Sequence, residues 1–367
     1  MFEEYVELVH LSRLALSGRR QDVQVFIRRL ARRLRSVRPD VADELERLLA
    51  ESPTRDSPLR NNALSAIPMD ADSRLKLVRP EFPVVLEVEP LWAPSVKPML
   101  EQIVDERTNT AVLSRAGLLP TRSLLFTGSP GVGKSLAARW IAARLGRPLV
   151  TLDLSAVMSS FLGKTGANVR HVLDYAKSMD CVLLLDEFDA VAKRRDDVSE
   201  IGELKRLVTV LLQEIDDWPP SGLLVAATNH PDLLDPAVWR RFEMLVKFPL
   251  PDDGQVREAV WQLLRGRVSN PQLIHAVSLL LRGLSFSDIE RELRLIIRRT
   301  AMYSIPTEDA LGELARRRSG DLGLEERKQI AELFLLAGFS QRETHDWTGL
   351  HRDTIRKLGS PRENAPE

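Results

Sequence analysis

The chain has 367 residues, of which 44% are hydrophobic, so it can bury a sizeable core and is not a disordered protein. Its 52 basic residues balance 52 acidic ones, which excludes the overall basic excess of a dedicated nucleic-acid binder and confines any such role to a local surface. The single cysteine, Cys181, excludes an intramolecular disulfide and fits a reducing cytoplasm.

The chain also lacks the usual signals of export or membrane insertion. Its N-terminus, MFEEYVELVH, is acidic and does not resemble a signal peptide. No apolar run reaches the about 20 residues that a membrane span needs. We therefore expect a cytoplasmic protein with no membrane partner, in which Cys181 is an inert core thiol.

The N-terminal part divides into a helical region and a linker. Residues 1–50 carry leucines at helical spacing and a dense run of arginines, which indicates either a solvated helix face or a stripe that binds a partner or phosphate. We expect this region to recruit a partner or substrate. Residues 51–75 are rich in Ser, Pro, Asn and Asp, which is typical of a linker.

Residues 76–250 alternate short apolar runs with helical stretches, which predicts an α/β fold. The predicted strands are the apolar runs at 83–88, 123–128, 148–154, 181–187 and 222–229. Continuous apolar strands separated by helices indicate a doubly wound parallel sheet covered on both faces. Residues 251–320 are predicted to be helical throughout.

The stretch GSPGVGKS at 128–135 matches the phosphate-binding pattern G-x-x-x-x-G-K-[ST] and lies between a predicted strand and a predicted helix. Its glycines allow backbone N–H groups to face phosphate oxygens, and the helix N-terminus adds positive potential. Lys134 is expected to reach the β- and γ-phosphates of ATP, and Ser135 to bind Mg²⁺. The predicted nucleotide-binding residues are Gly128, Ser129, Pro130, Gly131, Val132, Gly133, Lys134, Ser135 and Leu136.

Two further predicted strands end in polar residues that suit hydrolysis. CVLLLDE ends in Asp186, a second candidate Mg²⁺ ligand, and Glu187, a candidate general base for the attacking water. Asp189 is a weaker candidate. GLLVAATN ends at Asn229, whose amide either contacts the γ-phosphate and the water or caps the strand.

Together these motifs, over about residues 76–305, resemble the AAA ATPase family of ring-forming remodelling motors. The resemblance implies a P-loop AAA module with a helical lid, and Asn229 as the first sensor. Arg240 and Arg241 match the paired arginine fingers, which act on the nucleotide of the next subunit; a surface ion pair is the alternative. The stretch GLSFSDI at 283–289 is similar to the start of a lid helix, and Ser287 lies where the family approaches the nucleotide, although Phe286-Ser287 replaces the family's Gly-Ala.

The same resemblance gives a role to the loop SSFLGKTGANVR at 159–170. In the family this loop carries an aromatic-hydrophobic-glycine triplet that faces a central pore, and Phe161, Leu162 and Gly163 fit that pattern. An apolar tip on the ring axis can grip any side chain without reading a sequence. The alternative is that Phe161 packs against its own subunit.

The C-terminal residues 321–358 resemble a trihelical helix-turn-helix, with a tail at 359–367. The turn contains Gly349, and the following helix carries residues that could meet DNA, namely His351, Arg352, Thr354, Arg356 and Lys357. The pattern expects aliphatic residues where this chain has Thr344 and Thr348, and a small residue where it has the bulky His345. Such units also serve as protein-interaction modules, so DNA at residues 325–358 and a protein partner both stay open.

The function implied by these resemblances is an ATP-hydrolysing, Mg²⁺-dependent motor. It would assemble into a homo-oligomeric ring, expected to be a hexamer, and remodel or thread a protein substrate through a central pore. The six histidines form no H-E-x-x-H motif, so any proteolysis needs another chain. The layout is similar to bacterial AAA proteins paired with a subtilisin-like serine protease. The alternative function is an ATP-gated DNA-binding switch.

Overall fold

A computed structural model of the chain describes residues 30–31, 41–44, 78–86, 88–154, 165–191 and 201–359; for 165–168, 191, 201–207 and 236–237 it describes the backbone only. The chain divides into two compact units, residues 1–66 and 67–367, and the following account concerns the second. Most of the predicted recruiting region 1–50, the linker 51–75, the triplet Phe161-Leu162-Gly163 and residues 360–367 lie outside the described residues.

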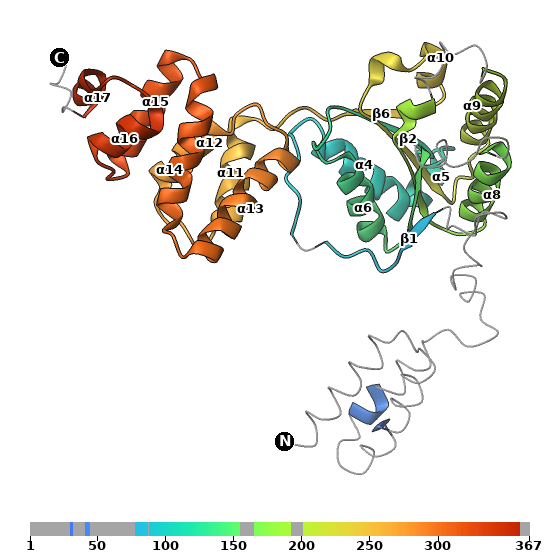
Figure 1. Cartoon of the computed structure of the whole chain (residues 1–367). Helices are drawn as coiled ribbons and strands as arrows, with labels where there is room; N and C mark the ends of the chain where they lie inside the picture. The colour runs from blue at the N-terminus through green and yellow to red at the C-terminus, as the bar shows by residue number, and fades with distance from the viewer. Residues whose placement is uncertain are drawn as a thin grey trace. The chain divides into compact units, whose positions relative to one another are not determined.

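The centre of the second unit is a mixed, mostly parallel sheet (Figure 1). Its order is β1-β3-β4-β5-β2-β6, and β1 alone runs antiparallel, along β3. The strands are β1 (Arg79–Glu81), β2 (Ser123–Thr127), β3 (Leu149–Asp153), β4 (Val182–Asp186), β5 (Leu223–Thr228) and β6 (Met244–Lys247). The predicted α/β fold is confirmed.

The first predicted strand is wrong. Residues 83–86 and 88 form no strand, and the edge strand β1 lies earlier in the chain. Val84 and Leu86 instead pack against the core beside α6, and the carbonyl of Val85 accepts a hydrogen bond from Arg139 at 3.3 Å. The apolar run therefore reflects packing of an irregular segment against a helix, not pairing in a sheet.

Helices cover both faces of the sheet (Figure 1). One face packs against α4 (Lys97–Thr108) and α6 (Lys134–Leu145), and the other against α8 (Thr165–Lys177) and α9 (Ile201–Asp216). The side chains of β2 alternate between these two cores: Leu124 and Phe126 face α4 and α6, and Leu125 faces the opposite side. Cys181 is buried in the core, as predicted, and burial raises its pKa to about 12.

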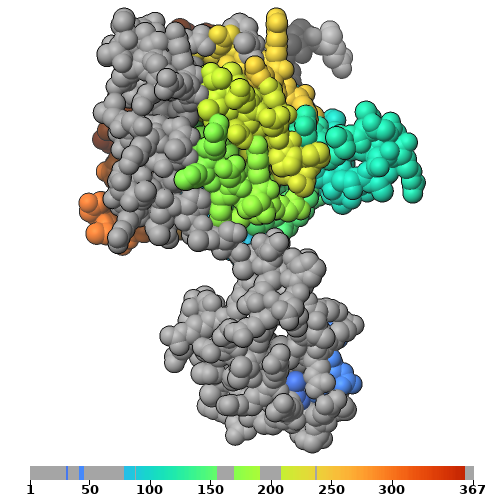
Figure 2. Space-filling model, turned by 90° about the vertical axis from the view of Figure 1, so that its right-hand side faces the viewer, coloured from blue at the N-terminus to red at the C-terminus, as the bar shows by residue number. Residues whose placement is uncertain are grey.

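A short apolar segment projects from this α/β part (Figure 2). Helix α5 (Thr110–Arg115) follows α4 directly, and its side chains make little contact with the core. Val112, Leu118 and Leu119 are exposed there.

The C-terminal part is helical and shares one hydrophobic core. The helices of the lid are α11 (Asp253–Leu264), α12 (Pro271–Leu280), α13 (Phe286–Tyr303) and α14 (Thr307–Arg318), followed by α15 (Leu324–Leu336), α16 (Gln341–Thr348) and α17 (Arg352–Leu358). One buried cluster runs from Val256 in α11 to Phe334 in α15 and Trp347 in α16. A Cβ atom on Gly312 of α14 would lie 2.1 Å from the Trp347 ring, so α16 is seated tightly on the lid. The predicted domain boundary at 320/321 therefore crosses a continuous core.

Helices α16 and α17 flank a turn at Gly349, whose φ of 64° is left-handed. Thr344 and Thr348 replace expected aliphatic residues and are fully buried, but each hydroxyl donates to the carbonyl four residues earlier, at 2.9 and 2.6 Å. His345 Nδ1 lies 2.6 Å from the carbonyl oxygen of Leu350, so the bulky ring bridges the turn. A small core of Ala331, Leu350 and Ile355 closes the unit.

Candidate nucleotide-binding and hydrolysis site

The phosphate loop joins β2 to α6, and two of its glycines are required by geometry. Gly128 has a φ of 146°, and a Cβ there would lie 2.3 Å from the carbonyl oxygen of Phe248. Gly131 has a φ of 77°, and a Cβ there would lie 2.5 Å from the hydroxyl of Ser285 at the start of α13. Both left-handed conformations and both close approaches favour glycine, at the first fixed position of the motif and at Gly131 within its variable stretch.

Lys134 lies at the centre of the loop. Its ammonium donates to the carbonyls of Gly128 and Ser129 at 2.6 and 2.9 Å and to Oδ1 of Asn229 at 2.7 Å. Burial lowers the pKa of Lys134 to about 8, while Asp186 and Asp189 act in the opposite direction. The lysine is thus held at the mouth of the loop, where a phosphate oxygen would compete with these acceptors for its hydrogen bonds.

The two predicted magnesium ligands meet. The hydroxyl of Ser135, at the start of α6, donates to Oδ2 of Asp186 at 3.0 Å, although the two residues are 51 positions apart in the sequence. A hydroxyl beside a carboxylate is an oxygen ligand pair that suits Mg²⁺, which takes few protein ligands and fills its remaining positions with phosphate and water. Within the described residues, no group of three or more His, Cys, Asp and Glu side chains could hold a metal alone.

Glu187 follows Asp186 with an unusual backbone conformation. Its φ of 53° is one of two positive values for non-glycine residues in the described part of the chain. Its N–H donates to Oδ1 of Asp186 at 3.0 Å, and its exposed side chain lines the cavity at the phosphate loop. Such backbone strain, of the order of 1–3 kcal/mol, is typical of active-site residues.

Asp189 fixes the end of β5. Its buried carboxylate accepts hydrogen bonds from the hydroxyl of Thr228 at 3.1 Å and from the N–H of Asn229 at 3.3 Å. Asn229 in turn holds Lys134, so β4, β5 and the phosphate loop are joined through side chains. Asp189 was only a weak candidate in the sequence, and its contacts indicate that it positions Asn229.

A cavity of about 1150 Å³ lies over these residues. Its floor consists of Pro130–Leu136, Asp186, Glu187 and Asn229, so the predicted binding residues converge on one space. One wall consists of residues 85–86 and 88–92, and the lid supplies the other through Ala259, Gln262, Leu263 and α13. Gly128 and Ser129 belong to the same site through their backbone carbonyls, which accept hydrogen bonds from Lys134.

Ser287 lies where the sequence predicted. Its N–H donates to the carbonyl of Gly131 at 3.2 Å, and its side chain lines the cavity.

Trp92 was not anticipated as a site residue. Its ring lines the cavity, and a Cβ on Gly133 would lie 3.3 Å from it. No motif in the sequence marks this tryptophan as a binding residue.

Arg240 and Arg241 do not join the cavity. They are exposed and lie just before β6, near the N-terminal end of β2, whereas the phosphate loop follows the C-terminal end of β2. Five residues of strand separate the two places, which corresponds to roughly 15 Å. Arg241 forms an ion pair with Asp216 at the end of α9, and both side chains are part-exposed.

Comparison with known proteins identifies the same module. The model of the family described as "ATPase family associated with various cellular activities (AAA)" matches residues 124–250. The chain is 37% identical over 231 residues to the AAA family ATPase y4kL of Sinorhizobium fredii, which covers 60% of this chain and 69% of the relative. A solved structure of the FIGL-1 AAA domain has the same fold, with a TM-score of 0.51 and 22% identity over 67% of this chain and 88% of that one.

Two further relatives are longer than the matched region. The ATP-dependent zinc metalloprotease FtsH of Acidothermus cellulolyticus is 33% identical over 59% of this chain and 33% of its own length. The proteasome-activating nucleotidase of Methanococcus maripaludis is 29% identical over 54% of this chain and 50% of its own length. The chain thus spans between a third and a half of these two relatives.

Proposed function

The chain belongs to the AAA family of ATPases and hydrolyses ATP, and on that premise we propose that it is a ring-forming motor that remodels or threads a protein substrate. The observation that carries this proposal is the separation of the arginines from the cavity. In such sites, an arginine close to the transferring phosphoryl group stabilises the charge of the transition state. Since Arg240 and Arg241 lie at the opposite end of β2 from their own phosphate loop, they suit the cavity of a neighbouring copy.

Within each cavity the residues have separate tasks. Lys134 and the backbone of 128–135 hold the phosphates, and Ser135 and Asp186 suit a Mg²⁺ ion, which when bound neutralises charge on the β- and γ-oxygens. Glu187 accepts the proton of the attacking water, and Asn229 orients that water or the γ-phosphate. Arg240 and Arg241 of the adjacent subunit stabilise the charge that develops during transfer.

The protein substrate is proposed from the relatives and from the loop at 159–170. The relatives include a zinc metalloprotease and a proteasome-activating nucleotidase, and both names refer to the breakdown of proteins. Phe161, Leu162 and Gly163 would form the gripping tip in the pore of a homo-oligomer, which we propose is a hexamer. Within the described residues, no helix combines the length and apolar character needed to cross a bilayer.

The remaining parts are assigned roles around this motor. We propose that residues 1–50 recruit a partner or substrate through the linker 51–75, that 76–250 and 251–320 bind and hydrolyse nucleotide, and that 321–358 extend the lid. A subtilisin-like protease acting in trans stays a prediction. DNA binding is not favoured by charge, because residues 324–358 contain six basic and six acidic side chains.

The test is ATP hydrolysis as a function of protein concentration, with the mass of the assemblies measured in the same samples. We expect activity per subunit to rise with concentration, Glu187→Gln to accumulate as an ATP-bound ring, and Arg241→Ala to assemble but not hydrolyse. Flat activity per subunit from monomers would refute the shared active site.

Threading is tested separately with a permanently unfolded, carboxymethylated protein as the probe. The probe should stimulate hydrolysis by the wild type but not by Phe161→Ala, which should keep its basal rate and its nucleotide affinity. If Phe161→Ala is stimulated equally, the pore role is wrong. Steeply salt-dependent binding of duplex DNA that is lost on changing Arg352 and Arg356 would instead favour the DNA switch.

A further inference from the structure

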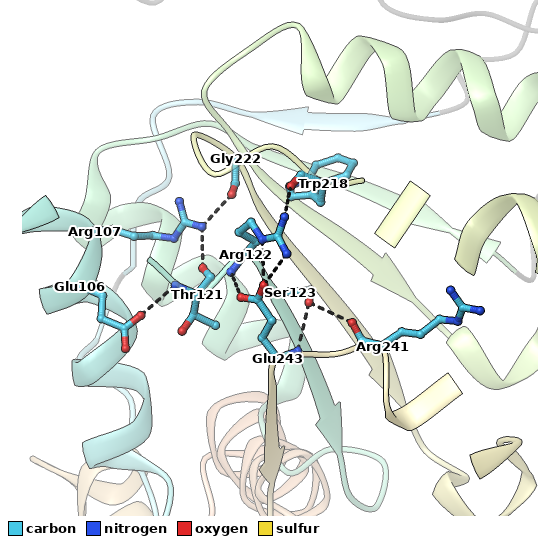
Figure 3. Close-up of polar contacts among 9 residues, drawn as sticks. All are labelled: Glu106, Arg107, Thr121, Arg122, Ser123, Trp218, Gly222, Arg241 and Glu243. Atoms are coloured by element: carbon cyan, nitrogen blue, oxygen red, sulfur yellow. Dashed lines mark hydrogen bonds and ion pairs between the residues drawn. The ribbon is translucent and has the colours of Figure 1, made fainter. Parts of the chain in front are cut away.

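The backbone that carries Arg241 is tied to the start of β2 (Figure 3). The buried hydroxyl of Ser123 donates to the carbonyl of Arg241 at 3.4 Å and accepts from the N–H of Glu243 at 3.1 Å. The N–H of Glu243 also reaches the carbonyl of Ser123 at 3.1 Å. One serine therefore holds the residues on both sides of Phe242, while the side chain of Arg241 extends away from these contacts (Figure 3).

An ion pair reinforces the same junction. The carboxylate of Glu243 accepts from the backbone N–H of Arg122 at 2.7 Å and from its guanidinium Nε at 2.8 Å. A second guanidinium nitrogen of Arg122 lies 2.8 Å from the same carboxylate. Arg122 also donates to the carbonyl of Trp218 at 3.3 Å, just after the end of α9, whose Asp216 pairs with Arg241. Arg122 thus links the two segments that hold the backbone and the side chain of Arg241.

A buried arginine fixes the chain around this junction. Arg107, with 7% of its surface exposed, donates to the carbonyls of Thr121 and Gly222 at 2.7 Å each, and to that of Ser221 at 3.3 Å. Glu106 accepts from the N–H of Thr121 at 2.9 Å. Arg107 therefore joins the segment before β2 to the segment before β5, and these bonds restrict movement at the N-terminal ends of the two strands.

We propose that Ser123 and the Arg122–Glu243 pair are positioning residues for Arg241, and that they act on hydrolysis in the adjacent subunit. This inference rests on the proposed function, because it requires that Arg241 works across a subunit boundary. An arginine side chain is long and flexible, so the position of the backbone that carries it determines how far it can reach into a neighbouring cavity. A displacement of about 1 Å at a catalytic group can cost on the order of a hundredfold in rate.

The test uses mixed rings of the full-length chain, in which the two halves of one active site come from different subunits. A donor subunit carries Glu187→Gln and cannot hydrolyse ATP, but it keeps Arg241. An acceptor subunit carries Arg241→Ala and keeps Glu187. Each is inactive alone, and an equal mixture should regain activity, since donor arginines complete acceptor sites.

Glu243→Gln is then placed on the donor or on the acceptor. On the donor it should reduce the regained activity about fivefold or more, because the arginine it positions is the one in use. On the acceptor it should leave the activity within about twofold, since that subunit no longer supplies Arg241. Ser123→Ala is a second variant with the same expected asymmetry, and Glu313→Gln, which breaks an exposed pair with Arg299 in the lid, should have no effect on either subunit.

The outcomes separate this inference from the proposed function. An equal loss from both subunits indicates general damage to the fold and overturns the inference, as does the absence of any loss on the donor. If the parent mixture regains no activity at all, the shared active site fails and the inference fails with it. Nucleotide affinity and assembly mass, measured on the same samples, should be unchanged by Glu243→Gln.

Discussion

The ammonium of Lys134 donates to Oδ1 of Asn229 across 2.7 Å, which joins the phosphate loop to the end of β5. Lysine is the main cation of the loop, and asparagine is the group expected to orient the γ-phosphate or the water. Their contact places both side chains next to each other on the floor of the cavity. A nucleotide entering the cavity must therefore exchange this hydrogen bond for contacts of its own.

ATP affinity should depend on pH through Lys134. Burial lowers the pKa of Lys134 to about 8, and bound phosphate would favour the charged form and raise it. Affinity should therefore be complete below pH 8 and weaken as the pH rises through that value, approaching about tenfold per unit. Titration of a fluorescent ATP analogue between about pH 7 and pH 9.5 measures this dependence.

Lys134→Arg is the matched control for the pH dependence. Its guanidinium stays charged, so whatever affinity it retains should be flat over the same range. A wild type that shows no weakening above pH 8, or an arginine variant with the same slope, would contradict the assignment to Lys134.

Asp189→Ala should act through Asn229. Loss of the buried carboxylate leaves Thr228 and Asn229 without an acceptor, so the free energy of unfolding should fall by about 1–3 kcal/mol. The turnover number should fall by about tenfold, as it should for Asn229→Ala. In the double variant the two effects on turnover should not add, because one residue works through the other. Independent, additive losses would disprove the link.

Trp92 should report nucleotide binding by its fluorescence. Its ring lines the cavity beside Gly133, so ATP should change the polarity around it. We expect a change in intrinsic emission that Trp92→Phe abolishes. Trp218 is fully buried in the core on the other face of the sheet, so Trp218→Phe should retain the change. The reverse pattern would exclude Trp92 from the binding wall.

Gly312→Ala should destabilise the lid, although alanine in a helix normally stabilises relative to glycine. The added Cβ would lie 2.1 Å from the ring of Trp347, and overpacking of this kind costs about 1–3 kcal/mol. Chemical denaturation measures the change. Gly320→Ala, where no atom lies within 4 Å of the added Cβ, is the control. Equal stability of the two variants would mean that α14 and α16 are not tightly packed.

Local patterns predicted the centre of the site well. The phosphate loop, Asp186, Glu187 and Asn229 each follow an apolar strand, and strand ends of a parallel sheet gather at one edge. The strands β1 and β6 were missed, since RPE has no apolar pattern and MLVK is short. The apolar run at 83–88 was wrongly assigned because periodicity does not tell a paired strand from an irregular segment packed on a helix.

Contacts between distant residues could not be read from the sequence. Arg122 and Glu243 are 121 positions apart, and neither belongs to a recognisable motif. Likewise Thr344 and Thr348 depart from the aliphatic residues that the helix-turn-helix pattern expects, and only the structure shows that their hydroxyls bond within the helix. Composition shows that a residue is polar, but only the fold shows whether its hydrogen bonds are satisfied.

The shared core of the lid and the last helices has a practical use. With Trp347 seated beside Gly312 and Phe334, α16 cannot move away from α14 without opening the core, and Ile355 packs α17 against Ala331 of α15. Truncating the chain after Arg318 would strip apolar cover from the lid, so shortened proteins are expected to aggregate. A fluorophore at Lys357 should instead move together with the lid. Its distance from a second fluorophore on the α/β part should therefore report each movement of the lid over bound ATP.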